Sequence, residues 1–410
     1  MIAVTPDKSR ARASRRALLR FLAASPVLAG LDVPRLWASA LAGRQSDLIT
    51  AAKDALDVFD FEAVARKNLS AAHLGYLETG TDDDATVRAN REGFTRYGLR
   101  VRRLVDINRI DTSVSLFAAW ETPIFLCPVG SHRAFHPDGE LAVARACKAA
   151  RHVLMLATPA TASIEEVTAA RGEPVWFQLY QRNDWNQTRQ MIRRAEAAGS
   201  PALVFTVDLI GGSNRLTGTR TRRRDTETCT ACHPNGFNDN SHKPMIRDLK
   251  PAPPAPEVGL PTWDFVKRLK DATPMKLVLK GIVTREDAEI AVGHGVDAVF
   301  VSNHGGRAES SGRSTIECVG EVAAGAAGRV PVMVDSGFRR GTDIFKALAL
   351  GARAVGVGRP YIWGLAAFGQ EGVEVVLAIL RRELQMVMRQ AGTPAIGRIT
   401  RAHLTGGPAS

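Results

Sequence analysis

The stretch KLVLKGIVTREDAEIAVGHGVDAVFVSNHGGR, residues 276–307, predicts a strand, a helix and a second strand in succession. Its two apolar runs, 276–280 and 297–302, are short and continuous, as in strands buried on both faces of a parallel sheet. The charged segment between them has the spacing of an amphipathic helix. A crossover of this kind joins parallel strands, so the stretch predicts one β-α-β unit.

The same pattern recurs along the chain. Amphipathic stretches alternate with further apolar runs at 123–127, 153–157, 175–180, 202–208, 331–335 and 354–358. Eight such units predict an α/β fold, a (β/α)8 TIM barrel over residues 120–390, after an N-terminal helical segment at 60–95. A Rossmann fold is disfavoured, because no Gly-x-Gly-x-x-Gly turn follows an early strand. Residues 209–274 separate two strands by more than a usual loop and predict an inserted loop after the fourth strand.

The net charge of +12 raises the question of nucleic acid or membrane binding. Most of this charge lies in two segments, residues 1–20 and 211–225, and the hydrophobic and charged fractions, 45% and 23%, are ordinary for a globular enzyme. No basic stripe interleaved with aromatic residues is present. We therefore expect no nucleic-acid partner.

The first basic segment has the pattern of a targeting signal. SRRALLRFLAASPVLAG, residues 14–30, pairs Arg15 with Arg16 ahead of a short apolar run and small residues. This is typical of a twin-arginine export signal, here residues 1–43, with the folded domain at 44–410 and an exported, periplasmic protein as the consequence. An amphipathic helix is the alternative. The run is too short to cross a bilayer, and we expect no transmembrane span.

Polar residues cluster where the predicted strands end, which is where barrel enzymes place their chemistry. His304 and Arg307 follow the sixth strand, and each could also be part of a solvated turn. The loops DSGFRRG and GVGRP after the last two strands are rich in glycine and arginine, as in barrel phosphate sites. The strand-end residues are Gln178, Tyr180, Thr206, Asp208, Lys280, Ser302, His304, Arg307, Asp335, Arg339, Gly358 and Arg359.

The motifs SNHGGR, LVLKGI, FQLY, TVD and RRGTDIFKALALGA together resemble the FMN-dependent 2-hydroxy-acid dehydrogenase and oxidase family over residues 55–405. The resemblance implies His304 as the base that takes a proton from the substrate, with Asp208 behind it. It implies Arg307 and Arg215 as carboxylate-binding groups and Tyr76 and Tyr180 beside the substrate. FMN is the implied cofactor, and the implied binding residues are Pro128, Val129, Gly130, Gln178, Thr206, Lys280, Ser302, Asp335, Gly337, Arg339, Gly358 and Arg359.

The resemblance implies oxidation of a lactate-like L-2-hydroxy acid to the 2-oxo acid. We expect electrons to pass to a cytochrome or another non-oxygen acceptor, and we expect a homo-oligomer. An oxidase that forms hydrogen peroxide and a non-catalytic flavin-binding protein are the alternatives. Ala157 and Pro159 replace residues that are commonly a serine and a bulky aromatic in the family, which predicts a wider substrate pocket.

The predicted inserted loop contains CTACH, residues 229–233. Cys229, Cys232 and His233 have the spacing of covalent c-type haem attachment. A local disulfide, a zinc site with His242 as fourth ligand and a chance occurrence remain open. Cys127, Cys147 and Cys318 lie in strand or helix patterns, and we expect them to be buried, unreactive thiols.

Overall fold

The computed structural model describes residues 48–226, 229–230, 232–234, 236, 239–250 and 259–407. The chain divides into two units, Met1–Ile49 and Thr50–Ser410, and the fold below belongs to the second. The predicted export signal at residues 1–43 lies outside the described residues.

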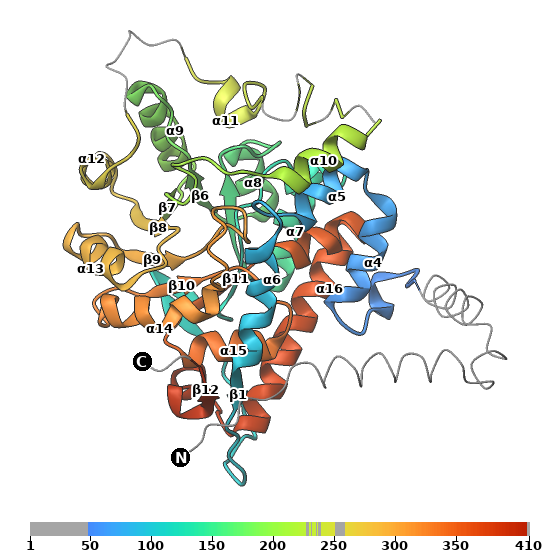
Figure 1. Ribbon diagram of the computed structural model, residues 1–410, viewed down its shortest axis with the longest axis vertical. Helices are drawn as coiled ribbons and strands as arrows, with labels where there is room; N and C mark the ends of the chain where they lie inside the picture. Colours follow the sequence, from blue (N-terminus) through green and yellow to red (C-terminus); the bar gives the residue numbers. More distant parts are fainter. Residues whose placement is uncertain are drawn as a thin grey trace, which may run out of the picture. The chain divides into compact units, whose positions relative to one another are not determined.

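Eight parallel strands close into a barrel, in which β10 and β11 lie between β9 and β4. Figure 1 shows the helices around these strands. This confirms the predicted (β/α)8 fold. Nearly every strand residue is buried, because helices cover the outside of the barrel and side chains fill its interior. Burial on both faces explains why the strands are continuous apolar runs in the sequence. The strands are β4 (Ile124–Leu126), β5 (Val153–Ala157), β6 (Trp176–Leu179), β7 (Ala202–Thr206), β8 (Lys276–Lys280), β9 (Ala298–Val301), β10 (Val332–Val334) and β11 (Ala354–Val357).

Helices cover the outside of the barrel and bury one apolar face each. In α12, for example, Phe265, Val266 and Leu269 are buried while the charged residues face outward. The helix starts are stabilised locally, as in α8, where Ser163 and Glu166 form a reciprocal capping box. The covering helices are α7 (Gly139–Ala150), α8 (Ile164–Arg171), α9 (Trp185–Ala197), α12 (Trp263–Ala272), α13 (Arg285–Gly293), α14 (Thr315–Ala326), α15 (Gly341–Ala349) and α16 (Arg359–Ala391).

The N-terminal part of the described chain is helical, as predicted, and is followed by short strand pairs. It contains η1 (Ala52–Asp54), α4 (Val58–Asn68), α5 (Ala71–Glu78), α6 (Ala85–Glu92) and η2 (Gly93–Arg96). β1 (Tyr97–Leu99) pairs antiparallel with β12 (Leu404–Gly406), and β2 (Val114–Leu116) pairs with β3 (Ala118–Trp120). The remaining short helices are η3 (His132–Ala134), η4 (Ile396–Arg398) and η5 (Arg401–His403).

The segment between β7 and β8, predicted as one long loop, contains α10 (Leu216–Arg224) and α11 (Pro244–Arg247) before α12. Helix α10 packs closely on α5: a Cβ atom added to Gly75 would lie 2.0 Å from the Thr221 hydroxyl oxygen. The carboxylate of Asp225 also accepts hydrogen bonds from the Ser70 hydroxyl and the Ala72 amide, at 2.7 and 2.6 Å. The first part of the insertion is therefore attached to the N-terminal helices.

Among the described residues, helix α16 is long and apolar enough, by length and composition alone, to cross a membrane. It also packs against α4, α7 and α15, and 61% of its most apolar window is buried within the fold. Non-helical backbone at Phe368 and Gly369 divides it. A core helix of a barrel passes the same test, so the finding is weak support for a span.

Candidate active site

A histidine–aspartate pair lies at the carboxyl ends of the strands. His304 follows β9 and its Nδ1 atom lies 2.8 Å from an oxygen of Asp208, which follows β7. Burial raises the pKa of Asp208, but His304 and Lys280 outweigh burial and lower it. An ionised carboxylate only accepts hydrogen bonds, so Nδ1 of His304 carries a proton and Nε2 of the neutral ring keeps its lone pair.

The free side of the His304 ring faces a tyrosine. The Tyr180 hydroxyl lies 3.3 Å from His304 Nε2, and the two rings stack at 6.5 Å. Burial, with a smaller contribution from Asp208, raises the pKa of Tyr180 well above its usual value. Tyr180 therefore keeps its proton and can donate it in a hydrogen bond to Nε2.

The backbone at this loop is held in an uncommon conformation. His304 has a φ of 58°, and Gly305 and Gly306 follow with φ of 69° and 84°. A left-handed histidine is sparsely populated and persists only where surrounding contacts fix it. The His304 amide donates to the Ser302 hydroxyl at 3.1 Å, and the Gly305 amide donates to the Ser336 hydroxyl at 3.0 Å. These contacts direct the imidazole over the end of the barrel.

Lys280, the last residue of β8, lies between two carboxylates. Its Nζ atom is 3.6 Å from Asp208 and 3.8 Å from Asp335, and it donates to the Ser302 hydroxyl at 2.8 Å. Burial alone would lower the pKa of Lys280, but Asp335 and Asp208 outweigh burial and raise it. The site thus contains a fixed positive charge at the centre of the barrel mouth.

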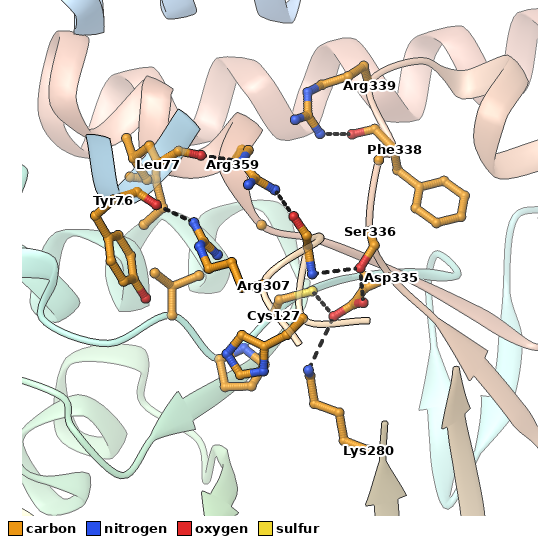
Figure 2. A pocket seen from close by; sticks show the side chains of 18 residues that line it. Tyr76, Leu77, Cys127, Lys280, Arg307, Asp335, Ser336, Phe338, Arg339 and Arg359 are labelled. Atoms are coloured by element: carbon orange, nitrogen blue, oxygen red, sulfur yellow. Dashed lines mark hydrogen bonds and ion pairs between the residues drawn. The ribbon is translucent and has the colours of Figure 1, made fainter. Parts of the chain in front are cut away.

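The first cavity of the site, with an empty volume of about 620 Å³ including open solvent, opens above Lys280 (Figure 2). Arg307, Arg339 and Arg359 line it, and Figure 2 shows the arginines around the same space as Asp335 and Lys280. Its lining residues are Tyr76, Leu77, Cys127, Pro128, Val129, Lys280, His304, Gly305, Arg307, Asp335, Ser336, Gly337, Phe338, Arg339, Gly356, Gly358, Arg359 and Ile362.

Among the described residues, the arginines of this cavity have no carboxylate partners, although Arg307 and Arg339 are buried and Arg359 is partly buried. They donate instead to backbone carbonyls: Arg307 to Tyr76, Arg339 to Phe338 at 2.9 Å, and Arg359 to Gly305 at 2.9 Å. Burial lowers the pKa of Arg339 to about 9 and, together with Arg307 and Arg339, lowers that of Arg359 well below its usual range. Buried cations of this kind are stabilised by an anionic ligand.

A second cavity adjoins the first on the other side of His304, with an empty volume of about 1350 Å³ including open solvent. Tyr76, His304 and Arg307 border both cavities. Arg215, whose Nε donates to the Ser213 hydroxyl at 3.2 Å, faces the second one. The other lining residues are Ala72, His73, Thr79, Gly130, Ser131, Ala134, Phe135, Pro159, Tyr180, Leu209, Gly218, Arg222, His233 and Asn240.

Most of the residues singled out in the sequence border one of the two cavities. Four of them lie behind the lining. Asp208 and Ser302 contact His304 and Lys280, while Gln178 and Thr206 form a buried side-chain hydrogen bond of 2.9 Å. Cys127, Cys147 and Cys318 are buried and free, as predicted, but Cys127 also lines the first cavity, with its thiol 3.5 Å from Asp335.

Cys229, Cys232 and His233 of the CTACH motif lie close together, and His233 lines the second cavity. Cys229 and Cys232 are joined by a disulfide, and the Cys232 sulfur lies 2.9 Å from His233 Nδ1. This arrangement does not support covalent haem. In a c-type haem the two sulfurs attach at the edge of the macrocycle and the histidine binds the iron at its centre, so the histidine nitrogen would lie further from the sulfurs than His233 does. His242 does not face the sulfurs through its Nε2, which contacts the Cys232 carbonyl oxygen at 2.8 Å. His242 is therefore not the fourth member of the group, as the predicted zinc site required; the residue whose ligand atom lies close to those of Cys229, Cys232 and His233 is His73.

Sequence reasoning missed several of these residues. Ser336 stands beside the predicted Asp335 and could have been found by extending that loop by one residue. His73 lies on α5, outside the barrel, and only the docking of α5 against α10 brings it to Cys232. No periodicity or motif in the sequence predicts the contact between His73 and Cys232.

Fold and cavities define a (β/α)8 barrel whose loops after the last two strands offer arginines and glycine-rich backbone to an anionic ligand. The family described as FMN-dependent dehydrogenase matches residues 65–406. The chain belongs to this family, which confirms the resemblance found in the sequence, and FMN is its cofactor.

Two relatives and one solved structure illustrate the similarity. A peroxisomal (S)-2-hydroxy-acid oxidase of Oryza sativa subsp. japonica is 38% identical over 357 residues, covering 85% of this chain and 95% of the relative. The 2-hydroxyacid oxidase 2 of Rattus norvegicus is 38% identical over 347 residues, covering 83% and 96%. The crystal structure of mandelate oxidase with (S)-2-phenylpropionate has a TM-score of 0.77 and 36% identity, covering 87% of this chain and all of the other.

The residues of the first cavity fit FMN. Arg339, Arg359 and the glycine-rich backbone at Gly337 and Gly358 offer an anion site where the phosphate of a barrel ligand usually binds. Gly337 has a φ of 90°, and a Cβ atom there would lie 2.0 Å from the Asn90 carbonyl oxygen, so this backbone has no room for a side chain. Lys280 would supply the positive charge that stabilises a reduced, anionic flavin ring.

Proposed function

We propose that this protein oxidises a 2-hydroxy acid to the 2-oxo acid with FMN as the primary electron acceptor. The observation that carries the proposal is the position of His304, whose unprotonated Nε2 lies at the boundary of the two cavities. A base there can reach a substrate in the second cavity beside a cofactor in the first. The names of the relatives, oxidases of 2-hydroxy acids, agree with this reaction.

The chain's own groups have distinct tasks in this reaction. His304 takes the substrate proton, and Asp208 stabilises the imidazolium that results. Arg307 and Arg215 bind the substrate carboxylate, because a guanidinium offers two parallel charge-assisted hydrogen bonds. Tyr180 donates its hydroxyl hydrogen bond near the reacting carbon, and Tyr76 covers the other side, with Arg307 4.6 Å from its ring centre. When bound, FMN accepts the two electrons.

Anaerobic mixing of the FMN-loaded protein with a panel of L-2-hydroxy acids tests the proposal. Bleaching of the oxidised flavin spectrum by one of them, with formation of the matching 2-oxo acid, is the expected result. A flavin that stays oxidised with every acid in the panel would point instead to a non-catalytic flavin-binding protein.

The second cavity favours a substrate larger than lactate. Pro159 lines it, as the predicted wider pocket requires, together with the apolar residues Ala134, Phe135 and Leu209. An aromatic side chain on the hydroxy acid would contact these residues, and a methyl group would leave them in water. We therefore propose an aromatic 2-hydroxy acid as the substrate in place of a lactate-like one. We expect kcat/KM to be higher for the aromatic acid than for lactate. A higher value for lactate would overturn this preference.

For the final electron acceptor we propose a one-electron acceptor protein with an acidic surface, such as a cytochrome. Helix α10 supports this, because Arg220, Arg223 and Arg224 are exposed on the segment that borders the second cavity. Dioxygen is the second candidate, favoured by the relatives' being named oxidases. An oxygen electrode separates the two: peroxide formation as fast as dye reduction means an oxidase.

We also propose that residues 1–43 export the folded protein, as the Arg15-Arg16 pair suggests. Arg15→Lys combined with Arg16→Lys in the full-length chain should retain the protein in the cytoplasm of a host with the twin-arginine pathway. Unchanged export of this double variant would contradict a twin-arginine signal.

A further inference from the structure

We propose that His73, Cys229, Cys232 and His233 form a zinc site when the two cysteines are reduced. This site lies outside the catalytic group and does not depend on the proposed reaction. Their ligand atoms all lie within 4.8 Å of one another, although His73 comes from α5 and the other three from the segment after α10.

The donor set matches the metal. Two thiolates and two imidazoles are a usual ligand set of tetrahedral zinc, and a Cys-x-x-Cys spacing is common in such sites. Four ligands at tetrahedral zinc distances lie roughly 3.3–3.8 Å from one another. The Cys232 sulfur is 3.8 Å from His73 Nε2 and 2.9 Å from His233 Nδ1, so small side-chain movements would create the site.

The surroundings fix the central ligand. Cys232 is fully buried, and its carbonyl oxygen accepts hydrogen bonds from Lys243 at 2.6 Å and from His242 at 2.8 Å. Lys243 is also fully buried and donates to Ser131 at 2.8 Å, which connects the segment to the loop after β4. A ligand backbone held on two sides is the support that a metal site requires.

The chemistry needs no oxidant. The structure contains the Cys229–Cys232 disulfide, which a phosphine and one water molecule convert to two thiols, the phosphine giving up two electrons and leaving as its oxide. Zn²⁺ then replaces the two thiol protons, which leave to solvent, and the metal keeps its oxidation state. The disulfide and the zinc site are therefore mutually exclusive states of one group.

Zinc would attach the insertion to α5 at a second point. Asp225 already accepts hydrogen bonds from Ser70 and Ala72 at the start of this helix, and His73 directly follows Ala72 in the same turn. His73 and His233 both line the second cavity, so the metal would fix one wall of it.

The test uses the full-length, FMN-loaded protein, kept under a dithiol-free phosphine reductant and dialysed against zinc or cobalt. We expect about one zinc per chain, and intense tetrahedral cobalt bands with sulfur-to-cobalt charge transfer. Zinc should also protect Cys229 and Cys232 from alkylation in the native protein. His73→Ala should weaken cobalt binding at least tenfold and remove this protection.

His242→Gln is the matched control, because it can keep the hydrogen bond to the Cys232 carbonyl and should bind metal as the wild type does. Cys318→Ser removes a buried thiol elsewhere and should also change nothing. Reduced wild-type protein that binds no zinc, cobalt bands that survive His73→Ala, or loss of metal from His242→Gln alone would each overturn the proposal. Because the His73 and His242 variants keep both cysteines, the test does not depend on a cysteine variant that fails to fold.

Discussion

At the scale of single residues, His304 carries the strongest prediction. His304→Ala should lower the rate of flavin reduction by about 10²–10⁴-fold, because no other group would take the substrate proton. FMN should remain bound, since Lys280, Arg339 and Arg359 are untouched. Stopped-flow bleaching measures the rate, and flavin content per chain is the control. A variant that is bleached as fast as the wild type would show that His304 is not the base.

The pH dependence follows from the burial of the same ring. Burial lowers the pKa of His304, Asp208 opposes this, and Lys280 lowers it further, so the net shift is downward. The base must be neutral, so activity should be present above the folded-state pKa and lost as the pH falls through it. We expect the acid limb of kcat/KM below the ordinary value of about 6.5.

Asp208→Asn provides the check on this assignment. The carboxylate favours the imidazolium, so its removal should move the acid limb to still lower pH while lowering the plateau rate, because the ring loses its orientation. An acid limb that moves upward in this variant would contradict the assigned roles. The free energy of unfolding depends on pH in the same direction. Because the folded-state pKa of His304 is lowered, its contribution to stability is present above its ordinary pKa and is lost as the pH falls through the folded-state pKa.

Arg307→Lys tests carboxylate recognition. Lysine keeps the charge but cannot form two parallel hydrogen bonds, and we expect KM for the best substrate to rise by roughly 10–100-fold, the equivalent of one lost charge-assisted bond. Arg145→Lys, at a surface ion pair with Asp138, is the control and should leave KM unchanged. An unaltered KM in Arg307→Lys would place the substrate carboxylate elsewhere.

At the scale of elements, the close approach of strand ends positions the base. Gly281, directly after β8, has a φ of 115°, and a Cβ atom there would lie 2.8 Å from Asp208 Cβ and 2.9 Å from its amide nitrogen. Gly281→Ala should therefore displace Asp208, slow flavin reduction and cost about 1–3 kcal/mol of folding stability through backbone strain. Rapid kinetics and thermal unfolding measure the two effects.

Gly295→Ala separates contact from strain. Gly295 also has a positive φ, 72°, but a Cβ atom there meets nothing within 4 Å. This variant should lose stability and keep the flavin reduction rate. Equal losses of rate in the two variants would show that the approach to Asp208 is not what matters.

At the scale of the whole molecule, the barrel could be predicted because its strands are buried on both faces, which makes them continuous apolar runs. The ends of β5 and β8 coincide with the predicted runs 153–157 and 276–280. The cluster around His304 was predictable too, because the carboxyl ends of all barrel strands meet at one rim.

The insertion was predicted less well. Its helix α12 has a clear amphipathic face, with Phe265, Val266 and Leu269 buried, yet it fell inside the predicted loop. Helix α10 buries none of its residues, so it has no hydrophobic pattern from which to predict it. His73 meets Cys232 across a sequence separation of 159 residues through helix docking, which local patterns do not encode.

Electron transfer out of the molecule is the last prediction. The exposed arginines of α10 should speed encounter with an acidic acceptor, and salt should slow it by screening. Arg220→Ser, Arg223→Ser and Arg224→Ser together should lower the second-order rate of reduction of an acidic cytochrome and flatten its salt dependence. Reduction of a small neutral dye should be unchanged, because the dye needs no charge complementarity.

A matched control removes three exposed arginines from the segment after β1, Arg100, Arg102 and Arg103. Figure 1 shows β1 at the end of the fold away from α10. Net charge falls equally in both triple variants, so only the place of the charge differs. If the control slows the cytochrome as much as the α10 variant, overall charge and not α10 governs encounter. If neither variant affects turnover and dioxygen is consumed at the dye rate, the protein is an oxidase like its named relatives.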